Sequence, residues 1–278
     1  MSSRRNFNRE YVEQRLRELG RALNKKITVF IAGGAAMSFY GLKEATKDID
    51  VALQNKAQVN SIISALKSLG YMDPHEGVTV DYARMNASAI LENSDGFRWD
   101  VFEKVVANKL FLSKGMIKRS SKLFNEGNLQ ARLLSKEDVF LLKSVTDRDG
   151  DIDDMGIVAE SGLRWEIIAK ECSHQSSHLD RVWEDALCNR LIDLRERRGV
   201  TAPIEKAICR LADKRILEMW IKRRVGEGAD TVRDLARESG ETEQVIRKAT
   251  NLLARKKMLF IDRSTRPHRI ATRKKGSS

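Results

Sequence analysis

The chain has 278 residues, 41% hydrophobic and 32% charged, enough to form two modest domains with a core in each. No apolar stretch approaches the roughly 20 residues that a membrane-spanning helix needs, and the N-terminus lacks the apolar segment of a secretory signal. We therefore expect a soluble, cytoplasmic protein.

The net charge of +12 is concentrated in the last quarter of the chain. Residues 205–278 hold 20 Lys and Arg against 10 Asp and Glu, whereas the rest of the chain holds 31 against 29. Because clustered positive charge attracts phosphates over long distances, this asymmetry indicates a polyanion-binding module attached to a nearly neutral body. The alternative is a solvated basic face and tail.

The N-terminal quarter alternates between helical and strand-like periodicity. It predicts an amphipathic helix at 8–23, a strand at 27–32, a short helix at 35–40, a strand at 48–53 and a helix at 57–69. We expect the first helix to pack on the sheet that the strands form.

Two further strands are predicted, because residues 78–91 alternate weakly and residues 97–102 alternate strongly. An Asn-Ser-Asp-Gly turn joins them. In the second strand Asp100 and Arg98 share the face opposite an apolar stripe. A buried unpaired acid is costly, so we expect a cationic group beside Asp100.

The rest of the chain reads as mainly helical, with a linker at 199–203 where Gly and Pro occur. Helical patterns cover residues 135–145, 144–158, 163–172, 178–197, 204–224, 231–238 and 241–256, and a hairpin follows at 258–273. The last three helices and the hairpin have the order of a winged helix-turn-helix. We expect an α+β fold with a small mixed sheet, divided into residues 1–134, 135–200 and 204–278.

The most informative residues are the two acids of the strand at 48–53. Side chains alternate along a strand, so Asp48 and Asp50 share one face. With Asp100 on a neighbouring strand, they could bind two divalent cations, Mg²⁺ or Mn²⁺, as metal ligands and catalytic residues. Gly33 and Gly34 would let the backbone approach a triphosphate, and the amides of the following helix favour an anion.

This pattern resembles the signature of the DNA polymerase β-like nucleotidyltransferase superfamily, over residues 27–155. The Gly-Gly pair and the segment Thr46-Lys47-Asp48-Ile49-Asp50 are similar to stand-alone enzymes related to abortive-infection (AbiE-type) toxins, some of which modify tRNA ends. The superfamily's common Ser after the first Gly is replaced by Gly34.

The resemblance extends to a helical cluster that in those enzymes holds a Lys, an Arg and acids. Lys143, Arg148, Asp151 and Asp154 are similar to it, which implies that Lys143 contacts the triphosphate. We therefore expect nucleotide binding by Gly33, Gly34, Lys47, Lys143 and Arg148.

Plainer interpretations remain for each feature. The glycines could form an ordinary turn, and an Asp-x-Asp pair could be a solvated strand edge. Three converging acids would repel one another without cations, however, which favours the functional interpretation. Asp151 and Asp154 could only cap or salt-bridge a helix.

The last predicted helix, at 241–256, would be the recognition helix of such a fold, and it carries polar residues on its outer face. They are Thr242, Gln244, Arg247, Lys248, Asn251 and Arg255. Arg and Lys could contact phosphates of a nucleic acid, whereas Gln and Asn could read bases. Winged helices also act as protein-interaction modules, which is the alternative.

These observations predict a Mg²⁺-dependent nucleotidyltransferase that moves a nucleoside monophosphate from an NTP to a hydroxyl acceptor, an RNA such as tRNA, with a protein antitoxin as a possible partner. The alternative is a DNA-binding winged-helix regulator whose nucleotidyltransferase fold only senses a nucleotide. Transfer to a protein or a small hydroxyl compound is a third possibility.

Overall fold

The computed structural model describes residues 5–74, 87–146, 148–179 and 181–272. The chain divides into two compact units, residues 1–205 and residues 206–278. The residues predicted as a separate helical domain, 135–200, lie within the first unit.

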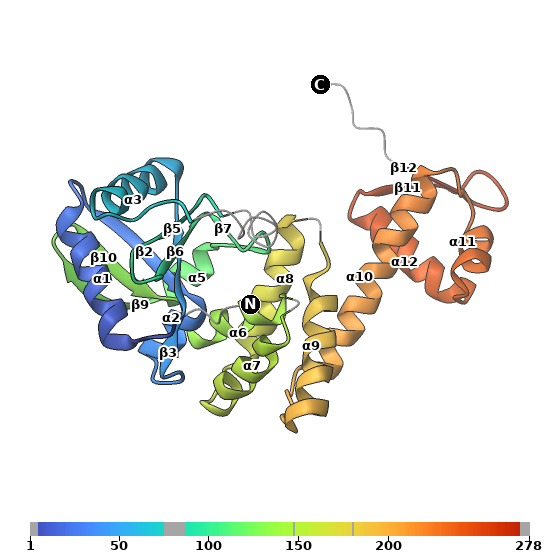
Figure 1. Ribbon diagram of the computed structural model, residues 1–278. Helices are drawn as coiled ribbons and strands as arrows, with labels where there is room; N and C mark the ends of the chain where they lie inside the picture. The colour runs from blue at the N-terminus through green and yellow to red at the C-terminus, as the bar shows by residue number, and fades with distance from the viewer. Residues whose placement is uncertain (1–4, 75–86, 147, 180, 273–278) are drawn as a thin grey trace. The chain divides into compact units, whose positions relative to one another are not determined.

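The first unit is organised around a six-stranded mixed sheet with the strand order β5-β6-β4-β2-β10-β9 (Figure 1). Its strands are β2 (Ile27–Ala32), β4 (Asp48–Leu53), β5 (Ala89–Glu92), β6 (Arg98–Glu103), β9 (Ser121–Glu126) and β10 (Leu129–Leu133). β4 pairs parallel with β6 and β10 pairs parallel with β2, whereas the other neighbours are antiparallel. The predicted α+β class with a mixed sheet is therefore confirmed.

The predicted strand at 78–91 falls mainly on residues 75–86, which lie outside the described residues; the strand observed there is β5. The predicted strand at 97–102 corresponds to β6. β9 and β10 were not predicted as strands, although β10 pairs with β2 in the interior of the sheet.

Helices α1 (Arg9–Ala22) and α3 (Lys56–Ser68) pack against the sheet and against each other. The side chain of Asn8 caps α1 by accepting a hydrogen bond from the Tyr11 amide at 3.0 Å. Leu16 and Leu19 of α1 are fully buried, so this helix covers the sheet as expected.

Short elements complete this part of the chain. They are β1 (Phe7–Asn8), α2 (Gly33–Phe39), β3 (Ala45–Thr46), β7 (Val105–Val106), β8 (Leu110–Phe111) and α5 (Lys114–Arg119). β1 pairs with β3, and β7 pairs with β8.

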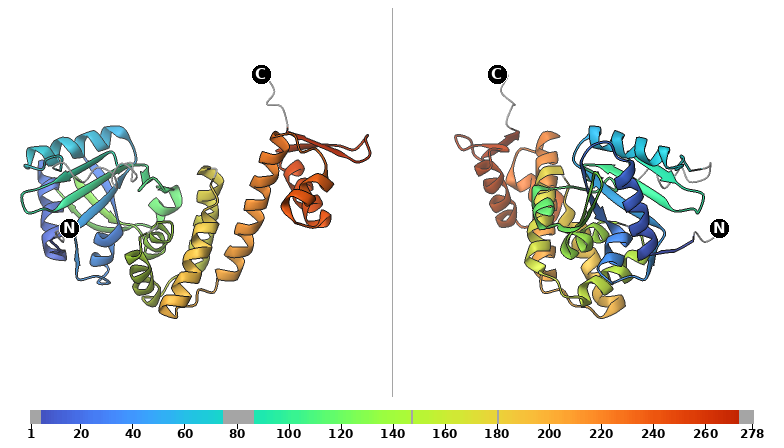
Figure 2. Two further views of the ribbon diagram at one scale, coloured as in Figure 1. Left: turned by 45° about the vertical axis from the view of Figure 1, so that its right-hand side comes forward. Right: turned by 90° about the vertical axis from the view of Figure 1, so that its left-hand side faces the viewer.

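Four helices follow the sheet in the first unit and pack against one another (Figures 1 and 2). They are α6 (Lys136–Ser144), α7 (Gly150–Glu160), α8 (Trp165–Leu179) and α9 (Trp183–Arg198). His178, predicted to start a new helix, belongs to α8 instead. α6 also contacts α2, so this helical group reaches the short helix that directly follows β2.

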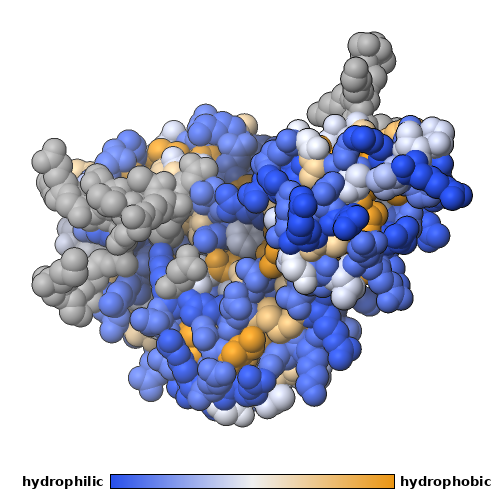
Figure 3. Space-filling view, turned by 90° about the vertical axis from the view of Figure 1, so that its right-hand side faces the viewer, coloured by the Kyte–Doolittle hydropathy of each residue, from blue (hydrophilic) through white to orange (hydrophobic). Residues whose placement is uncertain are grey.

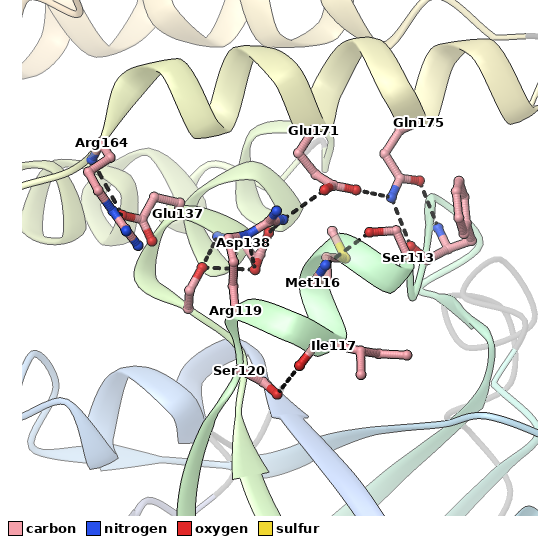
Figure 4. A network of polar contacts seen from close by, with 12 residues as sticks. Ser113, Met116, Ile117, Arg119, Ser120, Glu137, Asp138, Arg164, Glu171 and Gln175 are labelled. Carbon is pink, nitrogen blue, oxygen red and sulfur yellow. Dashed lines mark hydrogen bonds and ion pairs between the residues drawn. The ribbon is translucent and has the colours of Figure 1, made fainter.

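A buried polar network ties α5, α6 and α8 together (Figure 4). The Arg119 guanidinium donates from Nη2 to Asp138 Oδ1 at 2.6 Å and to Glu171 Oε2 at 2.7 Å. Gln175 extends the network, because its Nε2 donates to Glu171 Oε1 at 3.0 Å. One arginine therefore neutralises two buried carboxylates from two different helices.

The second unit follows the order predicted for residues 204–278. It contains α10 (Glu205–Gly226), α11 (Val232–Ser239), α12 (Glu243–Arg255) and the antiparallel hairpin β11 (Leu259–Asp262) with β12 (Arg269–Thr272). The core includes Ile221, Leu235, Ile246, Leu253 and Ile270, which come from all three helices and the hairpin. These residues form a separate hydrophobic cluster.

Hydrophilic side chains predominate on the face shown in Figure 3, with smaller hydrophobic patches among them. Over the described part of the chain, no helix is both long enough and apolar enough to cross a membrane.

Candidate functional site

The two acids of β4 lie on a central strand of the sheet. Asp48 and Asp50 alternate with Ile49 and Val51, whose side chains are completely buried. β6 pairs with β4 from Asp48 onward, and β2 pairs with the other edge of β4 from Asp50 onward, so hydrogen bonds fix the backbone that carries the acids. The alternation predicted from the sequence is the one observed.

Gly33 lies directly against Asp50. Ala32, the last residue of β2, is the register partner of Asp50, and Gly33 then adopts a left-handed conformation with φ +59°. A Cβ atom at this position would lie 1.9 Å from Asp50 Oδ2. Glycine is therefore required here for two independent reasons, the backbone angle and the close approach of a carboxylate.

Gly34 makes room for a different side chain. A Cβ atom there would lie 2.7 Å from Thr46 Oγ1. This buried hydroxyl donates a hydrogen bond to the main-chain oxygen of Asp48 at 3.0 Å. The Gly-Gly pair thus leaves space for the Asp50 carboxylate and for the Thr46 hydroxyl that contacts Asp48, a role that was not predicted for it.

Asp100 is buried on β6 and is the register partner of Asp50. Arg98, on the same strand and the register partner of Asp48, forms an ion pair with Glu92. Over the described residues, no group of three or more His, Cys, Asp or Glu side chains is arranged to hold a metal ion. The three-carboxylate metal site therefore stays a prediction.

The donor chemistry of β4 nevertheless suits Mg²⁺. Proteins commonly bind this ion through only one or two carboxylates, and waters and substrate phosphates complete its octahedral shell. Asp48 and Asp50 supply hard oxygen donors from adjacent positions on one strand face.

Electrostatics connect β4 to the α6–α7 segment. The pKa of Asp50 is raised to about 7, first by burial and then by the neighbouring Asp48 carboxylate. Arg148 and Lys143 act in the opposite direction, and Asp151 adds to the rise. The fold therefore brings residues more than 90 positions apart in sequence within electrostatic range of one another.

Lys143 is held in place by two acids of α7. Its ammonium group lies 2.8 Å from Asp151 Oδ1 and 2.6 Å from Asp154 Oδ2. Burial alone would lower the pKa of Lys143, but these carboxylates raise it above its ordinary value. Lys143 is thus a buried, charged group, and the two acids salt-bridge it rather than cap α7.

Lys43 belongs to the same cluster and was not predicted. Its Nζ lies 2.9 Å from Asp154 Oδ2 and 3.0 Å from Oδ1. Burial would raise the pKa of Asp154, but Lys143 and Lys43 together lower it. Asp154 therefore links the loop after α2 to α6. Lys43 lies in a loop, where the sequence has no periodicity from which this contact could be predicted.

Two other predicted nucleotide-binding residues are exposed. Lys47 lies between β3 and β4, and Arg148 lies between α6 and α7. The Arg190 side chain of α9 donates hydrogen bonds to the main-chain oxygens of Thr146 and Arg148, at 2.6 and 3.2 Å from its Nη2. Arg190 thus anchors the backbone on which Arg148 is carried.

The residues predicted to bind nucleic acid are on α12. Gln244, Arg247, Lys248 and Arg255 are exposed and Asn251 is partly exposed. Thr242 instead caps α12, since its hydroxyl accepts a hydrogen bond from the Val245 amide at 3.4 Å.

One comparison with known proteins identifies a family for the chain. A family model described as "Nucleotidyltransferase of unknown function (DUF6036)" matches residues 10–192, more than half of the chain and the whole span from Gly33 to Asp154. A search of curated proteins found no match. The chain belongs to this family of nucleotidyltransferases.

Proposed function

We propose that the protein transfers a nucleoside monophosphate from an NTP to a hydroxyl group of RNA, with Mg²⁺ or Mn²⁺ as cofactor. Family membership supports nucleotidyl transfer in general. The observation that carries the proposal is the convergence of Asp48, Asp50, Lys143 and Arg148 beside the Gly33 turn.

In this proposal Asp48 and Asp50 hold the divalent cation, and Asp100, next to Asp50 across the strand pair, is the third candidate ligand. The cation would supply charge neutralisation and lower the pKa of the attacking hydroxyl. Burial of Asp50 beside Asp48 is costly for two anions, so a bound cation would stabilise the ionised pair.

Lys143 and Arg148 bind the triphosphate. The acceptor oxygen attacks the α-phosphorus in line, a new P–O bond forms, and the bond to pyrophosphate breaks. Negative charge grows on the leaving pyrophosphate, where a fixed lysine and an exposed arginine give most stabilisation. Asp151 and Asp154 orient Lys143, and Lys43 shares the charge of Asp154.

The acceptor is assigned from charge. Residues 205–278 carry 20 Lys and Arg against 10 Asp and Glu, which supports a nucleic acid rather than a small molecule. The resemblance to AbiE-type toxins supports tRNA-like RNA as the acceptor and a protein antitoxin as a candidate partner. The order of elements in the C-terminal unit supports a winged helix-turn-helix.

The test is incubation of the protein with labelled NTPs, Mg²⁺ and total RNA. We expect label on RNA, its loss in Asp50→Ala, and normal labelling by Asp73→Ala, which removes an exposed acid after α3. Equal labelling by the Asp50→Ala and Asp73→Ala variants would contradict the assignment.

A DNA-binding regulator is the second candidate, favoured by the exposed basic residues of α12. It predicts a gel shift of the protein's own upstream DNA that is unchanged in Asp50→Ala. Failure to bind duplex DNA at low salt would exclude it.

A further inference from the structure

The second unit contains a groove between its helices and its hairpin. The groove has a volume of about 590 Å³, inside the range of ~300–1,000 Å³ that is usual for ligand sites. α11 and α12 form one wall, and the β11–β12 hairpin with its connecting loop forms the other. Of the residues predicted to bind nucleic acid, Arg247 and Asn251 line it.

Positive charge dominates the lining. Arg233 comes from α11, Arg247 from α12, and Arg263 and Arg266 from the hairpin loop. The one lining acid, Glu243, lies 3.5 Å from Arg247. Within the described residues, no ion pair neutralises Arg233, Arg263 or Arg266. Three exposed guanidinium groups therefore line the same groove, where they can bind an anion.

Between these arginines the groove is lined by apolar and planar groups. Ile261, Ile270 and Pro267 provide apolar contacts, and the His268 ring and the Asn251 amide provide planar, hydrogen-bonding ones. Guanidinium and imidazole planes stack on unpaired bases, whereas base pairs in a duplex keep their faces covered. A protein reads a duplex with a helix or hairpin that projects into the duplex groove. A concave, basic site therefore favours a single strand.

We propose that this groove binds a single-stranded segment of RNA, with phosphates on the arginines and bases against the apolar and planar lining. Naming RNA rests on the proposed function, for which the groove would hold an unpaired region of the acceptor. The site is distinct from the nucleotide-binding residues of the first unit, and it adds Arg233, Arg263 and Arg266 to the residues predicted from the sequence.

The test is fluorescence anisotropy of a labelled single-stranded RNA of about 12 nucleotides, with the full chain and without NTP. We expect the double variant Arg233→Gln/Arg263→Gln, with one change on each wall, to bind at least about tenfold more weakly. Its salt dependence should fall by about 1.4 in log–log slope, for two lost phosphate contacts at ~0.7 each. The variant Arg233→Lys/Arg263→Lys should retain most of the affinity.

The matched control is Arg210→Gln/Lys214→Gln, which removes the same charge from two exposed residues of α10 outside the groove. It should bind RNA within about twofold of the unchanged protein, because phosphate contacts act locally. Equal losses in both variants, no RNA binding, or tighter binding of a duplex DNA of the same sequence would overturn the proposal. Asp50→Ala should bind RNA normally, so failure of the groove and failure of the catalytic assignment are distinguishable.

Discussion

At the scale of single residues, the candidate site depends on Gly33, because this residue has no side chain. Gly33 combines a left-handed backbone with a position against the Asp50 carboxylate. We predict that Gly33→Ala moves this carboxylate, abolishes nucleotide transfer and lowers the free energy of unfolding by more than the ~1–2 kcal/mol that left-handed backbone costs alanine.

Gly41→Ala is the control for this prediction. Gly41 has φ +71°, but nothing lies within 4 Å of the position of an added Cβ atom. The variant should therefore lose only the stability that left-handed backbone costs alanine, and it should keep its activity. Thermal unfolding and transfer assays of both variants provide the comparison, and equal activities would show that Asp50 does not depend on Gly33.

Glu137 gives a prediction for stability against pH. Burial alone would raise its pKa, but hydrogen bonds, chiefly from Arg164 at 2.8 Å from Nε to Oε1, lower it to about 2. Its ordinary value is 4.5, so the ionised group stabilises the fold above that pH, and this contribution disappears as the pH falls from 4.5 towards 2.

Glu137→Gln should remove this contribution, which is on the order of 3 kcal/mol at most. Urea unfolding at several pH values should show a shallower loss of stability below pH 4.5 in the variant than in the unchanged protein. Parallel curves for the two proteins would contradict the assignment.

The sequence was sufficient to place some site residues but not others. Strand periodicity placed Asp48 and Asp50 on one face and predicted the strand that contains Asp100, which the structure pairs with β4. Periodicity carries no information about which loop meets which helix. The ion pair of Lys43 with Asp154 therefore could not be predicted, because it joins residues 111 positions apart.

At the scale of elements, the local sequence pattern predicts only some strands of the sheet. β2 and β4 are rich in buried apolar residues and were predicted from them. β9 has no buried residue and carries Lys122 and Glu126, so it lacks the alternation that marks a half-buried strand. β10 joins β2 through a parallel pairing across about 100 residues, which no local window contains.

The ion pairs of Arg119 with Asp138 and Glu171 stabilise the packing of α5, α6 and α8. We predict that Arg119→Leu lowers the free energy of unfolding by ~3–5 kcal/mol, because Asp138 and Glu171 would remain buried without their partner. Chemical denaturation measures this loss.

Arg17→Leu is the matched control, since Arg17 also contacts two carboxylates, Glu13 and Glu126, but at the surface. It should destabilise the fold much less than Arg119→Leu does, because solvent screens exposed ion pairs. A similar loss in both variants would mean that burial does not determine the strength of the Arg119 network.

At the scale of the whole molecule, the change in charge balance near residue 205 coincides with the division into two compact units. The first unit carries the family match and the charged cluster around Asp50, and the second carries the basic groove. The proposed chemistry and the proposed nucleic-acid binding thus lie in separate units, so each can be tested without the other.

The most direct test of the account compares NTP labelled on the α-phosphate with NTP labelled on the γ-phosphate, in the presence of Mg²⁺ and RNA. Nucleotidyl transfer predicts that RNA acquires the α label but not the γ label, and that Asp50→Ala abolishes this incorporation. Incorporation of the γ label, or unchanged α labelling by Asp50→Ala, would contradict the central claim.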